Sequence, residues 1–167
     1  MDDLPQLVSF IQNNLMRRTD IVTEDQLFTG NNTGDNLQGS VSIASAYTGG
    51  SLAGSVPAST ANNWDAILGL ITQVKEANGL VNGIFLTSGA YASLLVEKDT
   101  QGRYILPAGV MFNAQGQLTA WGVPLIETNA SLGSGVEFMG GDLSVINVRF
   151  RQGMRIQIVT GKHNTSG

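Results

Sequence analysis

The sequence predicts an α+β domain: a small mixed or antiparallel sheet flanked by helices, with a β-hairpin near the C-terminus. Three observations support this class. Apolar residues recur at helical spacing in several stretches, short apolar runs lie between Gly-rich turns, and residues 146–158 alternate between apolar and polar. The order helix, strand, helix and then several strands is typical of this class.

The N-terminal region predicts two helices. The first is expected over residues 3–18, with Asp3 as its cap and Pro5 in its first turn. Its apolar residues form one stripe that would pack against the domain: Leu4, Leu7, Val8, Ile11 and Leu15. Thr23 and Gln26 then match a capping box, which indicates a new short helix ending at Gly30.

Residues 31–61 are mostly Gly, Ser, Asn, Thr and Ala. We expect an extended, poorly packed excursion with a short strand at Val41–Ile43, and a run of this kind usually indicates function, a partner or disorder. Residues 34–36 and 50–54 resemble phosphate-binding loops only superficially. Neither run follows a clear strand or carries the Lys-Ser/Thr pair that contacts phosphate.

The middle of the chain predicts a helix, a buried central strand and another helix. Asn63 would cap a helix that ends at Asn78-Gly79. Its buried stripe is Trp64, Ile67, Leu68, Ile71 and Val74. The strand is Gly83–Thr87, and Ser88 would cap the next helix. The inner face of that helix is Tyr91, Leu94 and Leu95.

Turns and short strands follow. Polar turns at 99–102 and 113–116 lead into 103–106 and 118–121. The segment that organises the chain runs from Trp121 to Thr160. It holds Trp121–Pro124, an apolar strand at Leu125 and Ile126, a Gly/Ser turn, residues 137–142 and the alternating ribbon.

The ribbon predicts a hairpin with one apolar and one polar face. A three-residue turn at 151–153 pairs Phe150 with Met154, Val148 with Ile156 and Ile146 with Ile158. The polar face then carries the candidate subunit-interface residues Arg149, Arg151 and Arg155. Because like charges facing each other are unfavourable, we expect an acidic surface, such as another chain, over this face. The alternative is a solvated face whose arginines splay apart.

Composition excludes several classes. Hydrophobic residues make up 42% of the 167, enough for a packed core, and charged residues only 13%. The net charge of −4 argues against a nucleic-acid binder, and the absence of cysteine excludes disulfides and thiolate sites. No run approaches the roughly 20 apolar residues of a membrane span. The first residues lack the positive charge of a signal peptide, which favours a cytoplasmic origin.

No catalytic, cofactor or metal set is predicted. His163 is the only histidine, and the acidic residues Asp99, Glu127, Glu137 and Asp142 lie on separate segments. Asp142 is better interpreted as a partner for turn amides. A small hydrolase using Asp99 and Asp142 remains an alternative, because two facing carboxylates could support hydrolysis. Trp64 and Trp121 are interpreted as core residues, since no basic groove accompanies them.

Several motifs in order resemble the major capsid proteins of tailed bacteriophages, the HK97-like fold. They are Leu27–Asn31 followed by Leu37–Gly39, Asn82–Leu86 running into the 88–96 helix, Lys98–Tyr104, Trp121–Pro124, Gly141-Asp142 and Arg151–Gly153. The match departs from the family because no N-terminal arm or extended hairpin precedes the first helix, and the usual Gly-Asp-Gly is missing near residue 34.

The resemblance implies a shell protein without enzymatic activity or a small-molecule substrate. Residues 1–30 and 143–167 would belong to the peripheral domain, 62–142 would form the axial domain, and 31–61 would be an extended loop. Copies would assemble as hexamers and pentamers of an icosahedral head in the host cytoplasm. The finished virion would enclose DNA without sequence-specific binding. An encapsulin-like compartment shell is an alternative with the same fold. An adhesion or carbohydrate-binding module is disfavoured by the helical stripes.

Overall fold

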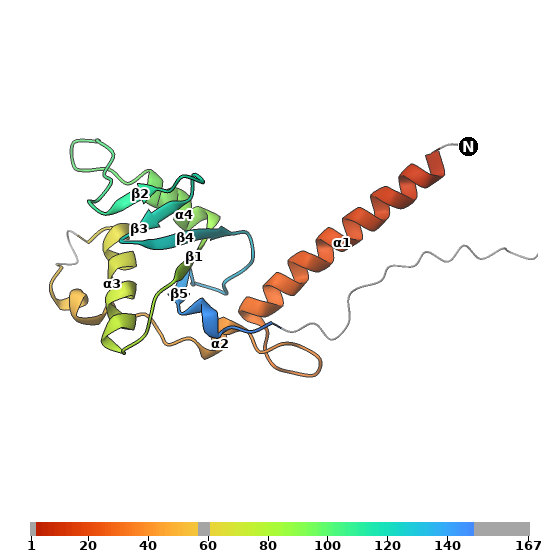
Figure 1. Cartoon of the computed structure of the whole chain (residues 1–167), viewed down its shortest axis with the longest axis horizontal. Helices are drawn as coiled ribbons and strands as arrows, with labels where there is room; N and C mark the ends of the chain where they lie inside the picture. The colour runs from red at the N-terminus through yellow and green to blue at the C-terminus, as the bar shows by residue number, and fades with distance from the viewer. Residues whose placement is uncertain (1–2, 57–60, 149–167) are drawn as a thin grey trace, which may run out of the picture.

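Five short strands form one mixed sheet in the order β2-β3-β4-β1-β5 (Figure 1). The strands are β1 (Gly83–Thr87), β2 (Val110–Phe112), β3 (Leu118–Ala120), β4 (Val123–Thr128) and β5 (Phe138–Gly141). β1 pairs in parallel with β4, and all other neighbours are antiparallel. The computed structural model describes residues 3–56 and 61–148. The predicted α+β class with a mixed sheet is confirmed.

Two helices, α3 (Asn63–Glu76) and α4 (Ser88–Leu95), pack on one face of the sheet. The main core lies between them and the strands. Its buried residues are Trp64, Ile67, Leu70, Ile71, Ile84, Leu86, Leu94, Val110, Leu118, Ala120, Val123 and Leu125. The predicted core role of Trp64 is confirmed, and Trp121 packs against the same cluster while partly buried. We call the sheet with α3 and α4 the body. Burial of this many large apolar side chains is the main source of its stability.

The opposite face of the sheet carries a second, smaller core. Successive strand residues point to opposite faces, so Phe85 lies on the other side of β1 from Ile84 and Leu86. It meets Phe28 edge-to-face, with ring centroids 5.1 Å apart. The buried members of this core are Phe28, Ala130 and Leu132.

One helix, α1 (Asp3–Thr29), replaces the two helices predicted for the N-terminal region. The capping-box interpretation of Thr23 and Gln26 is wrong, because α1 runs through both residues. No Gly or Pro lies between Pro5 and Gly30, so nothing in the sequence breaks the helix. The predicted end at Gly30 is correct, since its N–H donates to the Gln26 carbonyl at 3.0 Å.

The segment after α1 is more ordered than expected. The predicted strand at Val41–Ile43 is wrong, because α2 (Ser40–Ile43) is a single helical turn, and the 3-10 helix η1 (Gly50–Gly54) follows. Gly39 is required where the chain crosses α1. A Cβ on Gly39 would overlap the Phe28 carbonyl group. The chain here is held against the end of α1 with no room for a side chain.

The helix caps lie one residue earlier than predicted. The cap of α3 is Asn62, which exchanges hydrogen bonds with Asp65 in a capping box, and not Asn63. The cap of α4 is Thr87, and not Ser88. In α4 only Leu94 of the predicted inner face is fully buried, and Leu95 is 39% exposed. An eight-residue helix turns only a narrow face to the sheet, which leaves Leu95 outside it.

The predicted turns at 99–102 and 113–116 are present, and the second joins β2 to β3. After β5 the chain makes a short 3-10 helix, η2 (Leu143–Val145). Residues Ile146–Val148 follow and pair with no strand of the described residues. The rest of the predicted ribbon, with its register and its turn at 151–153, lies outside the described residues.

Candidate assembly surfaces

One apolar surface lies along α1. The helix projects from the body, and only its C-terminal end meets the sheet domain (Figure 1). Large apolar side chains along it are exposed: Leu7, Phe10, Ile11, Leu15, Met16, Ile21 and Val22. Leu7, Ile11 and Leu15 belong to the stripe that the sequence predicted, and that stripe was expected to be packed. The expectation is wrong for the described chain, in which these three side chains are 52%, 40% and 44% exposed.

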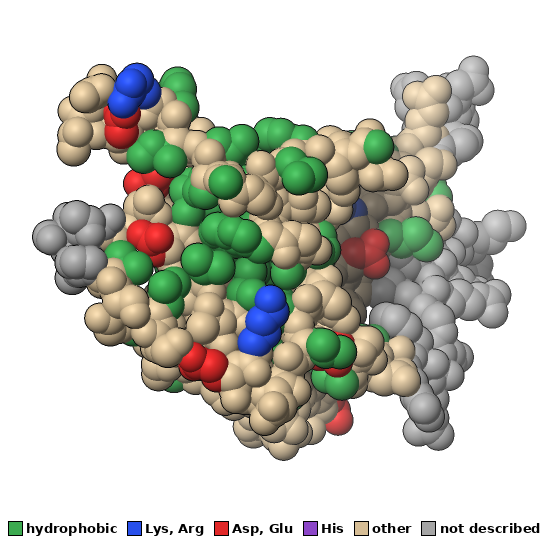
Figure 2. Space-filling model, turned by 60° about the vertical axis from the view of Figure 1, so that its left-hand side comes forward, with side chains coloured by type: hydrophobic (Ala, Val, Ile, Leu, Met, Phe, Trp, Pro, Cys, Tyr) green, Lys and Arg blue, Asp and Glu red, His purple; other side chains and the backbone are tan. Residues whose placement is uncertain are grey.

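A second apolar surface lies at the end of the body formed by α4, β2 and the loop between them. Its exposed members are Leu95, Val96, Tyr104, Leu106, Met111 and Phe112. Figure 2 shows further hydrophobic side chains over the middle of one face of the molecule, away from the loop that projects at its upper left. Exposed apolar groups of this extent usually mark contact sites. The sequence analysis missed this surface, since β2 and its loop carry no helical stripe.

The loop at this end is preorganised by its own hydrogen bonds. Asp99 accepts from the backbone N–H groups of Gln101 and Arg103 and from Arg103 Nε at 2.7 Å. These bonds hold the pKa of the Asp99 carboxyl below its usual value, with the Arg103 backbone N–H the largest cause. Lys98 Nζ lies 4.7 Å from the centroid of the Tyr104 ring. The loop therefore presents charged and aromatic groups in a fixed arrangement.

Residues 31–56 form a hydrogen-bonding surface whose one charged residue is Asp35, and two side chains of α3 hold residues 46–51 of it. Gln73 Oε1 accepts from the backbone N–H groups of Thr48 and Gly49, and Gln73 Nε2 donates to the Ala46 carbonyl at 2.9 Å. Glu76 accepts from the Ser51 N–H at the start of η1. The expectation of a poorly packed excursion is therefore wrong for residues 46–51. Most other side chains of the segment are exposed.

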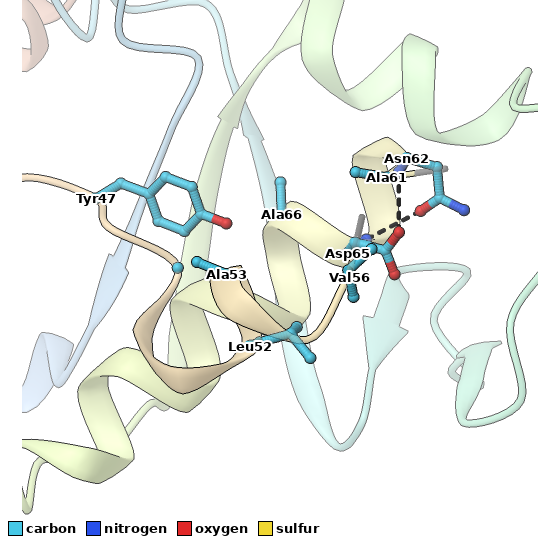
Figure 3. Close-up of a pocket in the computed structure, with 9 residues that line it drawn as sticks. Tyr47, Leu52, Ala53, Val56, Ala61, Asn62, Asp65 and Ala66 are labelled. Carbon is cyan, nitrogen blue, oxygen red and sulfur yellow. Dashed lines mark hydrogen bonds between the residues drawn. The ribbon is translucent and has the colours of Figure 1, made fainter. Parts of the chain in front are cut away.

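A cavity of about 240 Å³ lies between η1 and the start of α3 (Figure 3). Its polar groups are already engaged, because Asn62 and Asp65 hold each other in the helix cap. Burial, and secondarily the Asp65 carboxylate, raises the pKa of the Tyr47 hydroxyl, which stays protonated at neutral pH. The remaining lining is small and apolar. The cavity therefore lacks the convergent polar groups of a catalytic pocket.

A larger cavity of about 640 Å³ runs beside β5. Its lining combines α2, the segment through Tyr47, the end of α3 and residues 135–140. The Tyr47 and Phe138 rings meet edge-to-face in its wall, with centroids 5.2 Å apart. The described lining is mostly apolar, and Glu137 is its one carboxylate. It offers room for an apolar segment but no acid–base pair.

The two carboxylates of the hydrolase hypothesis are each committed to their own turn. Asp142 accepts from Ser144 Oγ at 2.6 Å and from Asn82 Nδ2 at 2.9 Å, which lowers the pKa of its carboxyl. This confirms the predicted role of Asp142 in a turn. Figure 1 shows the α4–β2 loop, which carries Asp99, at the opposite end of the body from the end of β5. Among the described residues, no group of three or more acidic or His side chains could hold a metal ion.

The predicted arginine surface of Arg149, Arg151 and Arg155 lies outside the described residues and stays a prediction, as does the solvated position of His163. The two superficial phosphate-loop runs are an exposed turn at 34–36 and the helix η1. Within the described part of the chain, no helix is long and apolar enough to cross a membrane.

Comparison with known proteins gives two matches. The model of the Phage capsid family matches residues 1–166. The major capsid protein of Enterobacteria phage HK97 is 35% identical over 141 residues, which cover 84% of this chain and 34% of that protein. The chain therefore spans about a third of the length of this relative. The family match includes the segments that carry the two exposed apolar surfaces.

Proposed function

This chain belongs to the phage capsid family, and we propose that it is part of a major capsid protein that builds the shell of a tailed phage or prophage. The observation that carries the proposal is the family match over residues 1–166. The proposed role is structural, with no reaction catalysed. It fits a described surface on which apolar and neutral hydrogen-bonding groups dominate and the acidic groups of the turns are locally satisfied.

Two apolar surfaces on separate parts of the molecule support assembly from many copies. A ring of identical subunits needs two different contact surfaces on each subunit, because each copy meets its neighbours head to tail. The surface along α1 and the surface at the α4–β2 end are separate in this way (Figure 1). We propose that the rings formed in this way are the hexamers and pentamers of an icosahedral head. Arg149, Arg151 and Arg155 would form a further contact surface.

The same proposal assigns each part of the chain to a domain of the capsid protein. Residues 62–142 form the axial domain near the symmetry axes, 1–30 and 143–167 belong to the peripheral domain, and 31–61 join them. The shell assembles in the host cytoplasm and encloses DNA in the virion. A net charge of −4 fits enclosure without sequence-specific binding.

Electron microscopy of the full-length protein, purified after expression in bacteria, tests the proposal. We expect closed shells with hexameric and pentameric capsomers. Purified shells that hold a cargo protein rather than DNA would favour the encapsulin-like alternative. A monodisperse small oligomer under all assembly conditions would contradict a shell role. A hydrolytic activity lost on Asp99→Asn or Asp142→Asn would instead support the hydrolase alternative.

A further inference from the structure

Two consecutive carboxylates attach the end of α1 to the last residue of β4 and to the loop that follows it. Glu24 Oε1 accepts from Thr128 Oγ1 at 2.9 Å, and Asp25 Oδ1 accepts from the Ser131 N–H at 2.9 Å. Thr128 is only 6% exposed, and its hydroxyl also accepts from the Ala130 N–H at 3.0 Å. Both carboxylates therefore reach a loop that the second core holds in place through Ala130 and Leu132.

Together these contacts fix the orientation of α1 relative to the body. Consecutive helix residues project about 100° apart, so the two bonds leave α1 on different sides and resist rotation about its axis. The Phe28–Phe85 contact is a third point one turn further on. From Glu24 to Phe28 is about 6 Å along the axis, while α1 extends about 30 Å beyond Glu24. A shift of about 1 Å at the joint would therefore move the far end of α1 by about 5 Å.

Helix stability does not explain carboxylates at this position. Negative charges near a helix C-terminus oppose the helix dipole, and the last turn of α1 has no basic residue to offset them. Their hydrogen bonds to Thr128 and Ser131 are the compensating interaction. Acidic residues that follow a Thr are typical of a helix start. For this reason the capping-box pattern wrongly indicated a new helix at Thr23.

We propose that Glu24 and Asp25 are positioning residues that set the angle at which α1 leaves the body. For its consequence the inference rests on the proposed shell function. Because α1 carries one of the two apolar surfaces, its angle determines how neighbouring copies meet and hence the curvature of the assembly. The angle itself is a property of the single chain and can be measured without assembly.

Distance measurement between two spin labels tests this directly. The chain has no cysteine, so Asn13→Cys on α1 and Ala92→Cys on α4, both exposed positions, give a single labelled pair. Double electron–electron resonance is recorded for this labelled chain and for the same chain with Glu24→Ala and Asp25→Ala. We expect a narrow distribution in the parent and at least a doubled width, or a displaced maximum, in the variant. Alanine keeps α1 helical.

Control variants distinguish a loss of the attachment of α1 from a general loosening of the fold. Asp20→Ala removes an exposed carboxylate about one turn earlier and should leave the distribution unchanged. Thr128→Val removes the hydroxyl that donates to Glu24 and should broaden the distance distribution. The tryptophan fluorescence of the folded body should stay unchanged in this variant. If a variant loses that signal, the single substitutions Glu24→Ala and Asp25→Ala replace it. Identical distributions in parent and folded variants would overturn the inference, as would a parent already as broad as the variant. Neither result depends on whether shells form.

Discussion

The body and α1 use the same kinds of apolar residue in opposite ways. In the body, Leu86 and Leu118 are 1% and 0% exposed between the sheet and its two covering helices. On α1, Leu7 and Leu15 are 52% and 44% exposed, although they recur at the same helical spacing as the buried stripe of α3. The difference teaches that periodicity identifies which face of a helix is apolar, but not whether its partner lies in the same described chain.

The largest expected effect comes from truncating matched leucines in the two regions. Leu86→Ala should reduce the free energy of unfolding by about 2–5 kcal/mol, because it leaves a cavity in the main core. Leu7→Ala should change it by about 0.5 kcal/mol or less in the isolated chain. Chemical denaturation followed by the fluorescence of Trp64 and Trp121, which both pack in the main core, measures both. A cost for Leu7→Ala close to that of Leu86→Ala would show that α1 already packs against something in solution.

A smaller loss is expected at the crossing that joins the two regions. Gly39→Ala should cost about 1–3 kcal/mol, because its Cβ would overlap the Phe28 carbonyl and force the backbone apart. Gly54→Ala is the matched control, since no atom lies within 4 Å of the added Cβ. Thermal unfolding by circular dichroism compares them. Equal melting temperatures for the two variants would mean that the crossing is not tightly packed.

The third effect concerns the surface segment held by α3. Gln73→Ala removes the acceptor for the Thr48 and Gly49 N–H groups, and we expect a loss of about 1 kcal/mol. Hydrogen exchange at those two amides should accelerate by about tenfold, while exchange in β1 should not change. Lys75→Ala, an exposed change on the same helix, is the control. Unchanged exchange at Thr48 would show that the segment is held by other contacts.

The smallest effect is the pH dependence of the α4–β2 loop. The folded-state pKa of Asp99 is lowered, so its stabilising contribution is present above the ordinary value of 3.8 and is lost as the pH falls through the lowered value. Wild type should exceed Asp99→Asn in unfolding free energy at about pH 6, and the difference should shrink at about pH 2.5. If the difference in unfolding free energy between wild type and Asp99→Asn is the same at both pH values, the pKa of Asp99 is not lowered by folding.

The sequence predicted the body well because its signals are local. The strand Gly83–Thr87 follows a turn and runs directly into α4, and its apolar run matches a strand with neighbours on both sides. The ends of α3 were found to within a residue or two for the same reason, since polar capping residues and a Gly follow simple rules.

The errors arose where distant contacts decide the structure. The residues Thr23–Gln26 satisfy a capping pattern, but continuing the helix brings Glu24 and Asp25 to a loop more than 100 residues later. Val41 enters the second core from a helical turn because Gly39 presses the chain against α1. Periodicity also gave no warning of the exposed Met111 on β2, since strand alternation does not say which face has a partner.

The attachment of α1 has a consequence for the order in which the chain becomes structured during synthesis. Thr128 and Ser131 follow their carboxylate partners by 104 and 106 residues, and β1 gains its parallel neighbour only when β4 has been made. Contacts so distant in sequence form slowly. The ribosome therefore makes α1 before the residues that anchor it, and Phe28 at its end stays without its buried contacts until the second core has been synthesised. Early chain termination would leave these contacts unmade, which makes it a route to aggregation.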